Sequence, residues 1–142
     1  MLDDISGALL RVGVGLLLVP HGLRLGFGLF RNTGMPPKTF QQSIADFDLQ
    51  GYRPGWFWAR AVVFTEVVCG PLVAVGLFTR LAAIPVVLFL LVACFERYRI
   101  GRWFWNTLGV EYVLLWTLAA VWVLAHGGGT YSLDHVFGLH FS

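Results

Sequence analysis

Long, uninterrupted apolar runs dominate the chain. Four of them, at about residues 5–25, 56–78, 81–98 and 107–126, have the roughly 17–25 residues that a helix needs to cross a lipid bilayer. Their apolar residues are continuous and do not alternate with polar ones, which favours helices over the strands of a β-barrel. Short connections at residues 79–80 and 100–106 make consecutive helices antiparallel neighbours. The pattern therefore predicts an all-α fold, an integral membrane four-helix antiparallel bundle in a single domain of residues 1–142.

The connection between the first two predicted spans is long enough to hold an element of its own. Phe40, Ile44 and Phe47 recur there at helical spacing between polar residues, which predicts an amphipathic helix over about residues 38–48 at the membrane interface. We interpret this helix either as a lid over the adjacent end of the bundle or as a surface anchor only.

Composition supports a lipid environment and excludes several classes of protein. Of the 142 residues, 57% are hydrophobic and 13% are charged, against about 25% charged in soluble domains. The ten basic residues are scattered among apolar runs, which argues against nucleic-acid binding. Cys69 and Cys94 lie in separate apolar stretches without a CxxC spacing, so neither a disulfide framework nor a zinc site is expected.

The charges near the span ends predict an orientation. Arg31, Lys38 and Arg53 lie in the first connection and further arginines surround the third, so these two connections are expected to face the cytoplasm. Both termini, including an outer tail at residues 127–142, then lie on the outer side of the membrane. The acidic Asp3 and Asp4 precede the first apolar run, which is not typical of a cleaved signal peptide.

Ionisable residues inside the predicted spans are the candidate site. A charged side chain at mid-membrane costs about 2.5–3.5 kcal/mol, so Arg11, His21, Glu66 and Glu111 need partners or a wet cavity. Asn106 is expected to cap the fourth helix, with Glu111 one turn further along and facing the bundle. These five residues are predicted to border one small polar cavity between the first, second and fourth spans. The alternative, which stays open, is that Arg11 and Glu66 form a buried ion pair that only fixes helix register, and that His21 makes a plain hydrogen bond.

The backbone near these residues is expected to be irregular or closely packed. Pro71 cannot donate a hydrogen bond to the carbonyl of Val67, so the helix is expected to loosen next to Glu66. Small residues share one face of the first span with Arg11, which predicts that this face looks inward. Gly22 and Gly26 form a GxxxG spacing, which indicates close helix contact either within the chain or in a homodimer.

Several motifs together resemble the DoxX family. They are Arg11 with His21-Gly22, Glu66 with Gly70, the segment Val-Gly-Leu-Phe-Thr-Arg-Leu-Ala-Ala at 75–83, Gly-Val-Glu-Tyr at 109–112, and Gly-Gly-Gly-Thr-Tyr-Ser-Leu-Asp at 127–134. The resemblance implies a small bacterial or archaeal four-helix membrane protein. Similar proteins are linked to thiosulfate:quinone oxidoreductase or are membrane partners of redox and detoxification enzymes. Many of them carry a further histidine late in the third span, where this chain has Ala93-Cys94-Phe95-Glu96.

The expected function is that of a redox-associated membrane protein that binds a quinone-like molecule in the polar cavity. His21 would donate a hydrogen bond to a quinone carbonyl, Glu66 and Glu111 would relay protons, and Arg11 would stabilise negative charge. The sequence has no motif for haem, metal or nucleotide binding, so electrons are expected from a soluble or membrane-bound redox partner. The alternative is a non-catalytic membrane scaffold or assembly factor for a redox or detoxification complex.

The tail has a predicted structural role. The three glycines at 127–129 permit a tight turn, and Ser132 is expected to cap a short helical turn through Asp134 and His135. An ion pair between Asp134 and Arg80 is predicted to tie the tail to the connection between the second and third spans.

Overall fold

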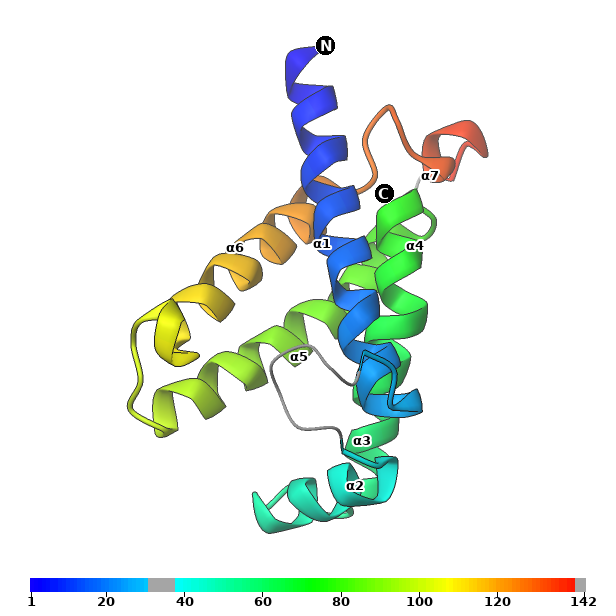
Figure 1. Cartoon of the computed structure of the whole chain (residues 1–142). Helices are drawn as coiled ribbons and strands as arrows, with labels where there is room; N and C mark the ends of the chain where they lie inside the picture. Colours follow the sequence, from blue (N-terminus) through cyan, green and yellow to red (C-terminus); the bar gives the residue numbers. More distant parts are fainter. Residues whose placement is uncertain (31–37, 140–142) are drawn as a thin grey trace.

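A computed structural model describes residues 1–30 and 38–139, and every secondary-structure element within these ranges is helical (Figure 1). The predicted all-α class is therefore confirmed. Arg31, which contributed to the predicted orientation, lies outside the described residues. In chain order the elements are α1 (Leu2–Phe27), α2 (Phe40–Leu49), α3 (Gly55–Phe64), the π-helix η1 (Thr65–Cys69), α4 (Gly70–Val75), α5 (Thr79–Arg99), the 3₁₀-helix η2 (Trp105–Thr107), α6 (Val110–His126) and α7 (Leu133–Val136).

The four long helical segments pack as two pairs. One pair is α1 with the continuous segment α3–η1–α4, and the other is α5 with α6. Figure 1 shows the α5–α6 pair leaning away from the first pair toward the end of the molecule that carries α2. The antiparallel bundle of four aligned helices that the sequence predicts is therefore not confirmed in that form.

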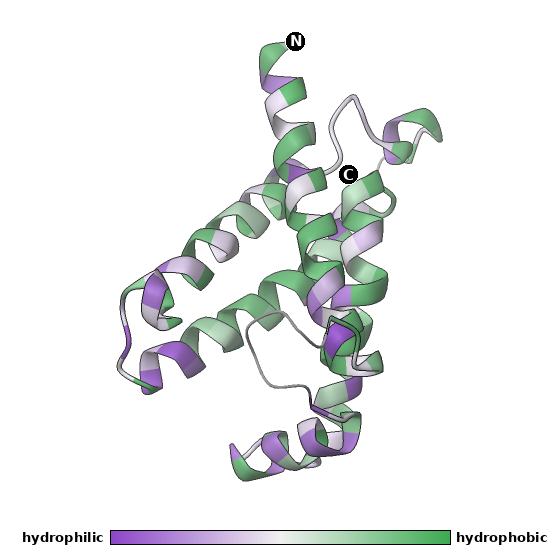
Figure 2. Ribbon diagram, viewed as in Figure 1, coloured by the Kyte–Doolittle hydropathy of each residue, from purple (hydrophilic) through white to green (hydrophobic). Residues whose placement is uncertain are grey.

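Two helical segments are long and apolar enough to cross a membrane. They are Gly55–Val75 and Thr79–Arg99, each of 21 residues, which corresponds to about 32 Å at a rise of 1.5 Å per residue. The apolar α6 is shorter, at Val110–His126. Figure 2 shows hydrophobic residues along all four long segments, and hydrophilic residues in α2 and at the end of α5.

The segment that was predicted to lie at the membrane interface forms a helix, α2, close to the predicted range. Thr39 is the N-cap of α2 and forms a capping box with Gln42. The Thr39 side chain accepts from the backbone N–H of Gln42, and the Gln42 side chain accepts from the backbone N–H of Thr39. Phe40, Ile44 and Phe47 are half-buried, as the amphipathic pattern requires. The location of α2 at a membrane interface stays a prediction.

The face of α1 that was predicted to look inward is buried. It carries Arg11, Gly15, Leu18 and Gly22. A Cβ atom added to Gly22 would lie 2.7 Å from the Cβ of Glu66, so only glycine permits this approach of α1 to η1. The GxxxG spacing is thus used for packing within the chain, because Gly26 likewise contacts Val63.

The α4–α5 turn is held by charged side chains from both ends of the chain. Arg11 on α1 donates to the carbonyls of Val73 at 2.9 Å and Ala74 at 2.5 Å, which lie at the end of α4. Asp134 accepts from the backbone N–H groups of Phe78 at 2.7 Å and Thr79 at 2.9 Å, where α5 begins. A cation at a helix C-terminus and an anion at a helix N-terminus are both stabilised by the helix dipole.

The predicted ion pair between Asp134 and Arg80 is wrong. The Asp134 carboxylate, 2% exposed, is occupied by backbone N–H groups and by the Thr79 hydroxyl at 2.6 Å. Arg80 instead donates to the carbonyl of Ala125 at 3.2 Å. The expected cap at Ser132 is confirmed, because its hydroxyl accepts from the backbone N–H of His135.

Candidate functional site

A small cavity lies between α1, the beginning of α2 and the α3–η1 segment. Its volume is about 260 Å³, and we call it the polar cavity. It brings together two residues predicted for the site, His21 and Glu66. The other lining residues are Arg24, Leu25, Lys38, Ser43 and Val62.

Glu66 is the buried acid of the polar cavity, with 4% of its surface exposed. It lies in the π-helical turn η1, where the backbone N–H of Gly70 donates to the carbonyl of Thr65. This turn is the irregularity expected from Pro71 in the next turn, and π-helical turns are frequent at functional sites. Among the described residues, the Glu66 carboxylate makes no hydrogen bond or ion pair. An uncompensated carboxyl group in a buried position is costly to retain, which indicates a role other than packing.

His21 lies at the open side of the polar cavity. Its ring is exposed, whereas the adjacent Gly22 is buried against Glu66. The helix α1 continues through Pro20 to Phe27, so the proline does not end it. Gly22 directly follows His21, so the close approach of Gly22 to Glu66 also places His21 beside the cavity that Glu66 lines.

The remaining wall of the polar cavity is basic and polar. Arg24 lies one turn after His21 on α1, and Lys38 forms an ion pair with Asp46 of α2. The buried Ser43 of α2 adds a hydroxyl, which makes α2 one wall of the cavity. The lining thus combines basic side chains, a histidine and the carboxyl group of Glu66 within one small volume.

Arg11 does not lie in the polar cavity, and the ion pair with Glu66 that was considered for it is not formed. Its guanidinium group, 2% exposed, donates to the carbonyls at the end of α4 and to that of Tyr131 at 2.7 Å. These partners belong to the end of the molecule that carries the N-terminus and α7 (Figure 1).

The expectation that Glu111 faces the bundle is wrong, and so is the expectation that Asn106 caps the fourth helix. Leu108 adopts a left-handed conformation with φ of 58°, which separates η2 from α6, so α6 begins at Val110 with Gly109 as its N-cap. Asn106 lies exposed in η2. Glu111 lies in the first turn of α6, exposed, and accepts from the backbone N–H of Trp105 at 3.2 Å. A role of Glu111 or Asn106 in binding stays a prediction, at a place away from the polar cavity.

Sequence reasoning missed three polar residues of the polar cavity, Arg24, Lys38 and Ser43. Of these, Lys38 was used only to predict the orientation of the chain. A usable signal was present for Arg24, because it follows His21 by three residues and therefore shares its face of the helix. No comparable signal exists for Lys38 and Ser43, whose proximity to Glu66 depends on how α2 folds back against α1.

The apolar helices among the described residues and the comparisons with known proteins together indicate a helical membrane protein. The family model described as DoxX matches residues 7–98, and the chain belongs to the DoxX family. The matched region includes Arg11, His21 and Glu66 and ends before Glu111.

A curated relative is an uncharacterized membrane protein of Mycobacterium tuberculosis. It is 36% identical over 86 residues, which cover 56% of this chain and 42% of that protein. The chain thus aligns with less than half the length of this relative. No solved structure matches the chain.

Proposed function

We propose that the polar cavity of this DoxX family membrane protein binds the head group of a quinone-like molecule, and that the protein serves a partner redox enzyme. The observation that carries the proposal is the buried Glu66 carboxyl group, which has no partner among the described residues and borders the same cavity as His21. A quinone carbonyl accepts hydrogen bonds, and its reduction takes up electrons and protons in equal number. His21 is suited to donate the hydrogen bond, and Glu66 to exchange the proton.

The size and charge of the polar cavity support a small, electron-rich head group. Its volume of about 260 Å³ is below the roughly 300–1,000 Å³ of pockets that enclose drug-sized ligands. A single ring fits this space better than an extended molecule. Arg24 adds positive charge at the wall, which stabilises negative charge on a carbonyl oxygen during reduction.

The partner enzyme is part of the proposal because the chain shows no electron carrier of its own. The sequence has no haem-attachment, nucleotide-binding or redox-cysteine motif. Electrons would therefore enter from a soluble or membrane-bound donor, and the described residues would bind the acceptor and move its protons.

We also propose that all four long helical segments cross the cytoplasmic membrane, with both termini outside. In support, the N-terminus, the α4–α5 turn and α7 lie toward one end of the molecule in Figure 1. Reporter fusions at each terminus and in the α5–α6 connection test this arrangement. Opposite locations of the two termini would contradict it.

The binding proposal is tested with the full chain purified in mild detergent and titrated with a short-chain benzoquinone. We expect His21→Ala to weaken binding about fivefold or more, because it removes a hydrogen bond worth about 0.5–1.5 kcal/mol. Glu66→Gln keeps a hydrogen-bond donor but cannot exchange a proton, so it should slow proton uptake when the bound quinone is reduced. The matched controls are His126→Ala and Asp3→Asn, since both residues are exposed and neither lines the cavity. Equal binding by all four variants and the wild-type protein would refute the proposal.

A second candidate function is that of a scaffold for a redox or detoxification complex. The observation in its favour is that Arg11 and Asp134, the two most buried charges, both bind backbone groups and hold helix ends together. The two functions differ in one outcome. His21→Ala abolishes quinone-linked activity of the assembled complex if the cavity binds the acceptor, and leaves it intact if the chain only assembles the complex.

A further inference from the structure

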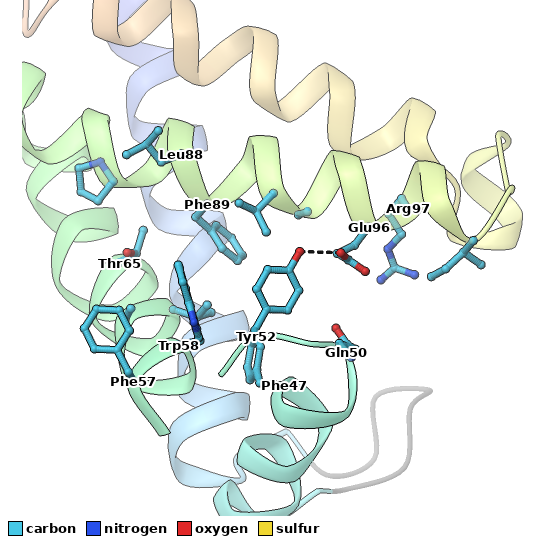
Figure 3. Close-up of a pocket in the computed structure, with 16 residues that line it drawn as sticks. Phe47, Gln50, Tyr52, Phe57, Trp58, Thr65, Leu88, Phe89, Glu96 and Arg97 are labelled. Atoms are coloured by element: carbon cyan, nitrogen blue, oxygen red, sulfur yellow. Dashed lines mark hydrogen bonds between the residues drawn. The ribbon is translucent and has the colours of Figure 1, made fainter. Parts of the chain in front are cut away.

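A second, larger hollow lies between α3 and the second half of α5, and we call it the apolar groove (Figure 3). Its volume is about 820 Å³. Apolar side chains from the two helices form its length, among them Phe57, Trp58, Leu88, Phe89 and Val92. None of these residues lines the polar cavity.

The charged side chains of the apolar groove lie at one end, which we call its polar end. Figure 3 shows Tyr52, Glu96 and Arg97 together at this end, with Leu88 and Thr65 at the other. On α5 the lining extends from Pro85 to Arg97, which is about 18 Å at a rise of 1.5 Å per residue. One leaflet of a bilayer contributes about half of a hydrocarbon core about 30 Å thick. The groove therefore has the length of a single acyl chain in one leaflet.

The charge at the polar end favours an anion. The Tyr52 hydroxyl donates to Glu96 Oε1 at 2.5 Å, and Arg99 Nη1 lies 3.1 Å from the same oxygen, so the Glu96 charge is balanced. Partial burial and the hydrogen bond to Glu96 raise the pKa of Tyr52 to about 12, which keeps the phenol neutral. Arg97 is half-buried at the rim, and its guanidinium group has no hydrogen bond or ion pair among the described residues. One positive charge is thus left over where the groove ends.

We propose that the apolar groove binds an anionic phospholipid, with an acyl chain along α3 and α5 and the phosphate at Arg97. An anionic head group supplies the negative charge that would pair with Arg97. Basic pockets between membrane helices are typical sites for such head groups. A zwitterionic lipid is a poorer match because its cationic group offsets the phosphate. The apolar groove and the polar cavity share Val62 in their linings. The lipid proposal gives no role to His21, Arg24 or Glu66, so either proposal can fail without the other.

The test uses the full chain in vesicles of phosphatidylcholine that contain increasing fractions of phosphatidylglycerol with brominated acyl chains. Bromine quenches tryptophan fluorescence on contact, and Trp58 lies in the wall of the groove. We expect quenching to saturate at a low fraction of the brominated anionic lipid, and to require about fivefold more of it in Arg97→Gln. That factor corresponds to about 1 kcal/mol for one basic residue near an anionic surface. Trp58→Phe should remove the low-fraction component of the quenching.

Matched variants separate a built site from ordinary lipid contact. Arg102→Gln removes the same charge three residues beyond the end of α5, outside the groove, and should leave the lipid preference unchanged. Arg97→Lys keeps the charge and should retain most of the preference. Ala93→Phe places a large side chain in the groove and should abolish the quenching seen at low fractions of the brominated lipid. Leu91 is exposed and does not line the groove, so Leu91→Phe should leave that quenching unchanged.

Three results would overturn the proposal. They are an equal effect of Arg97→Gln and Arg102→Gln, an unchanged quenching curve in Ala93→Phe, or an equal response to brominated phosphatidylcholine. Circular dichroism and gel filtration establish that each variant is folded before it is compared. If Arg97→Gln does not fold, the comparison of Arg97→Lys with Ala93→Phe still decides between a specific and a general lipid contact.

Discussion

Replacing Arg11 by Met tests whether this buried cation holds the fold together or serves a ligand. Methionine has a similar length and fills the same space, but it donates no hydrogen bond. The carbonyls of Val73, Ala74 and Tyr131 would lose the donors that Arg11 provides at 2.9, 2.5 and 2.7 Å.

The expected loss of stability follows from which carbonyls have another donor. Val73 keeps one, because the N–H of Gly76 also donates to its carbonyl at 3.1 Å. The hydrogen bond to Ala74 is buried and that to Tyr131 is partly buried, so the Ala74 carbonyl loses most. Leaving a buried carbonyl unsatisfied costs about 1–3 kcal/mol. The Ala74 and Tyr131 carbonyls both lose a donor, and methionine offsets part of their combined cost because it buries no charge, so we expect a net loss of about 2–3 kcal/mol.

The measurement is equilibrium unfolding of the purified chain in mixed detergent micelles, followed by circular dichroism. Arg80→Met is the matched control, because Arg80 is exposed and makes one hydrogen bond of 3.2 Å to Ala125. It should change the free energy of unfolding by less than about 0.5 kcal/mol. Arg11→Lys keeps the charge but lacks the planar fork that reaches carbonyls in two directions, so its loss should be intermediate.

The outcome decides between a structural and a ligand-binding Arg11. If the free energy of unfolding of Arg11→Met lies within about 0.5 kcal/mol of the wild-type value, the three hydrogen bonds do not hold the α4–α5 turn. Unchanged stability together with lost quinone binding would restore Arg11 to the ligand site that the sequence predicts.

Three further changes have expected outcomes. Asp134→Ala removes the acceptor at the beginning of α5 and should destabilise the fold by about 1.5–3 kcal/mol in the same unfolding assay, since hydrogen bonds to a charged group are lost; a smaller loss than for an exposed carboxylate would contradict the capping role. Gly22→Ala forces α1 away from Glu66 and should cost about 1–3 kcal/mol, whereas Gly13→Ala, whose new Cβ meets nothing within 4 Å, should be neutral or stabilising. In a spectrophotometric titration one tyrosine should ionise near pH 12 and be missing in Tyr52→Phe. Because its pKa is raised on folding, the contribution of Tyr52 to stability should be complete below about pH 10 and lost as the pH rises through about 12; ionisation of Tyr52 near pH 10 would refute this.

The parts of the fold that depend on local sequence could be predicted. Apolar length located the long helices, and small residues on one side of α1 identified its buried face. Pro71 indicated a loosened turn near Glu66, and the structure has the π-helix η1 there. Each of these features follows from residues close together in the chain.

The parts that depend on distant backbone groups could not be predicted. Every residue carries a backbone N–H and a C=O, so the sequence does not reveal which of them a charged side chain will bind. Charges were therefore paired with other charges, as in Arg80 with Asp134, while the structure pairs Arg11 and Asp134 with the ends of helices. The left-handed Leu108 likewise moved the beginning of α6 past Asn106. This could not be predicted because residues other than glycine rarely adopt that conformation.

The candidate site was half predicted for the same reason. Arg11, His21, Glu66 and Glu111 were grouped because each is ionisable, lies inside a predicted span and was expected to face the bundle. An inward face does not tell which neighbouring helix a residue meets, so the sequence could not separate Arg11 and Glu111 from the other two.

The π-helical turn at Thr65–Cys69 also constrains how this protein can change over generations. Such a turn holds one residue more than the α-helical turn that would replace it. Losing one codon there would let an α-helical turn take its place with little rotation of α4 relative to α3, because the π-helical turn already accommodates its extra residue. Glu66, which meets Gly22, lies inside the turn, whereas the carbonyls that bind Arg11 lie after it. A descendant without the extra residue would keep the attachment of Arg11 and change only the surroundings of Glu66.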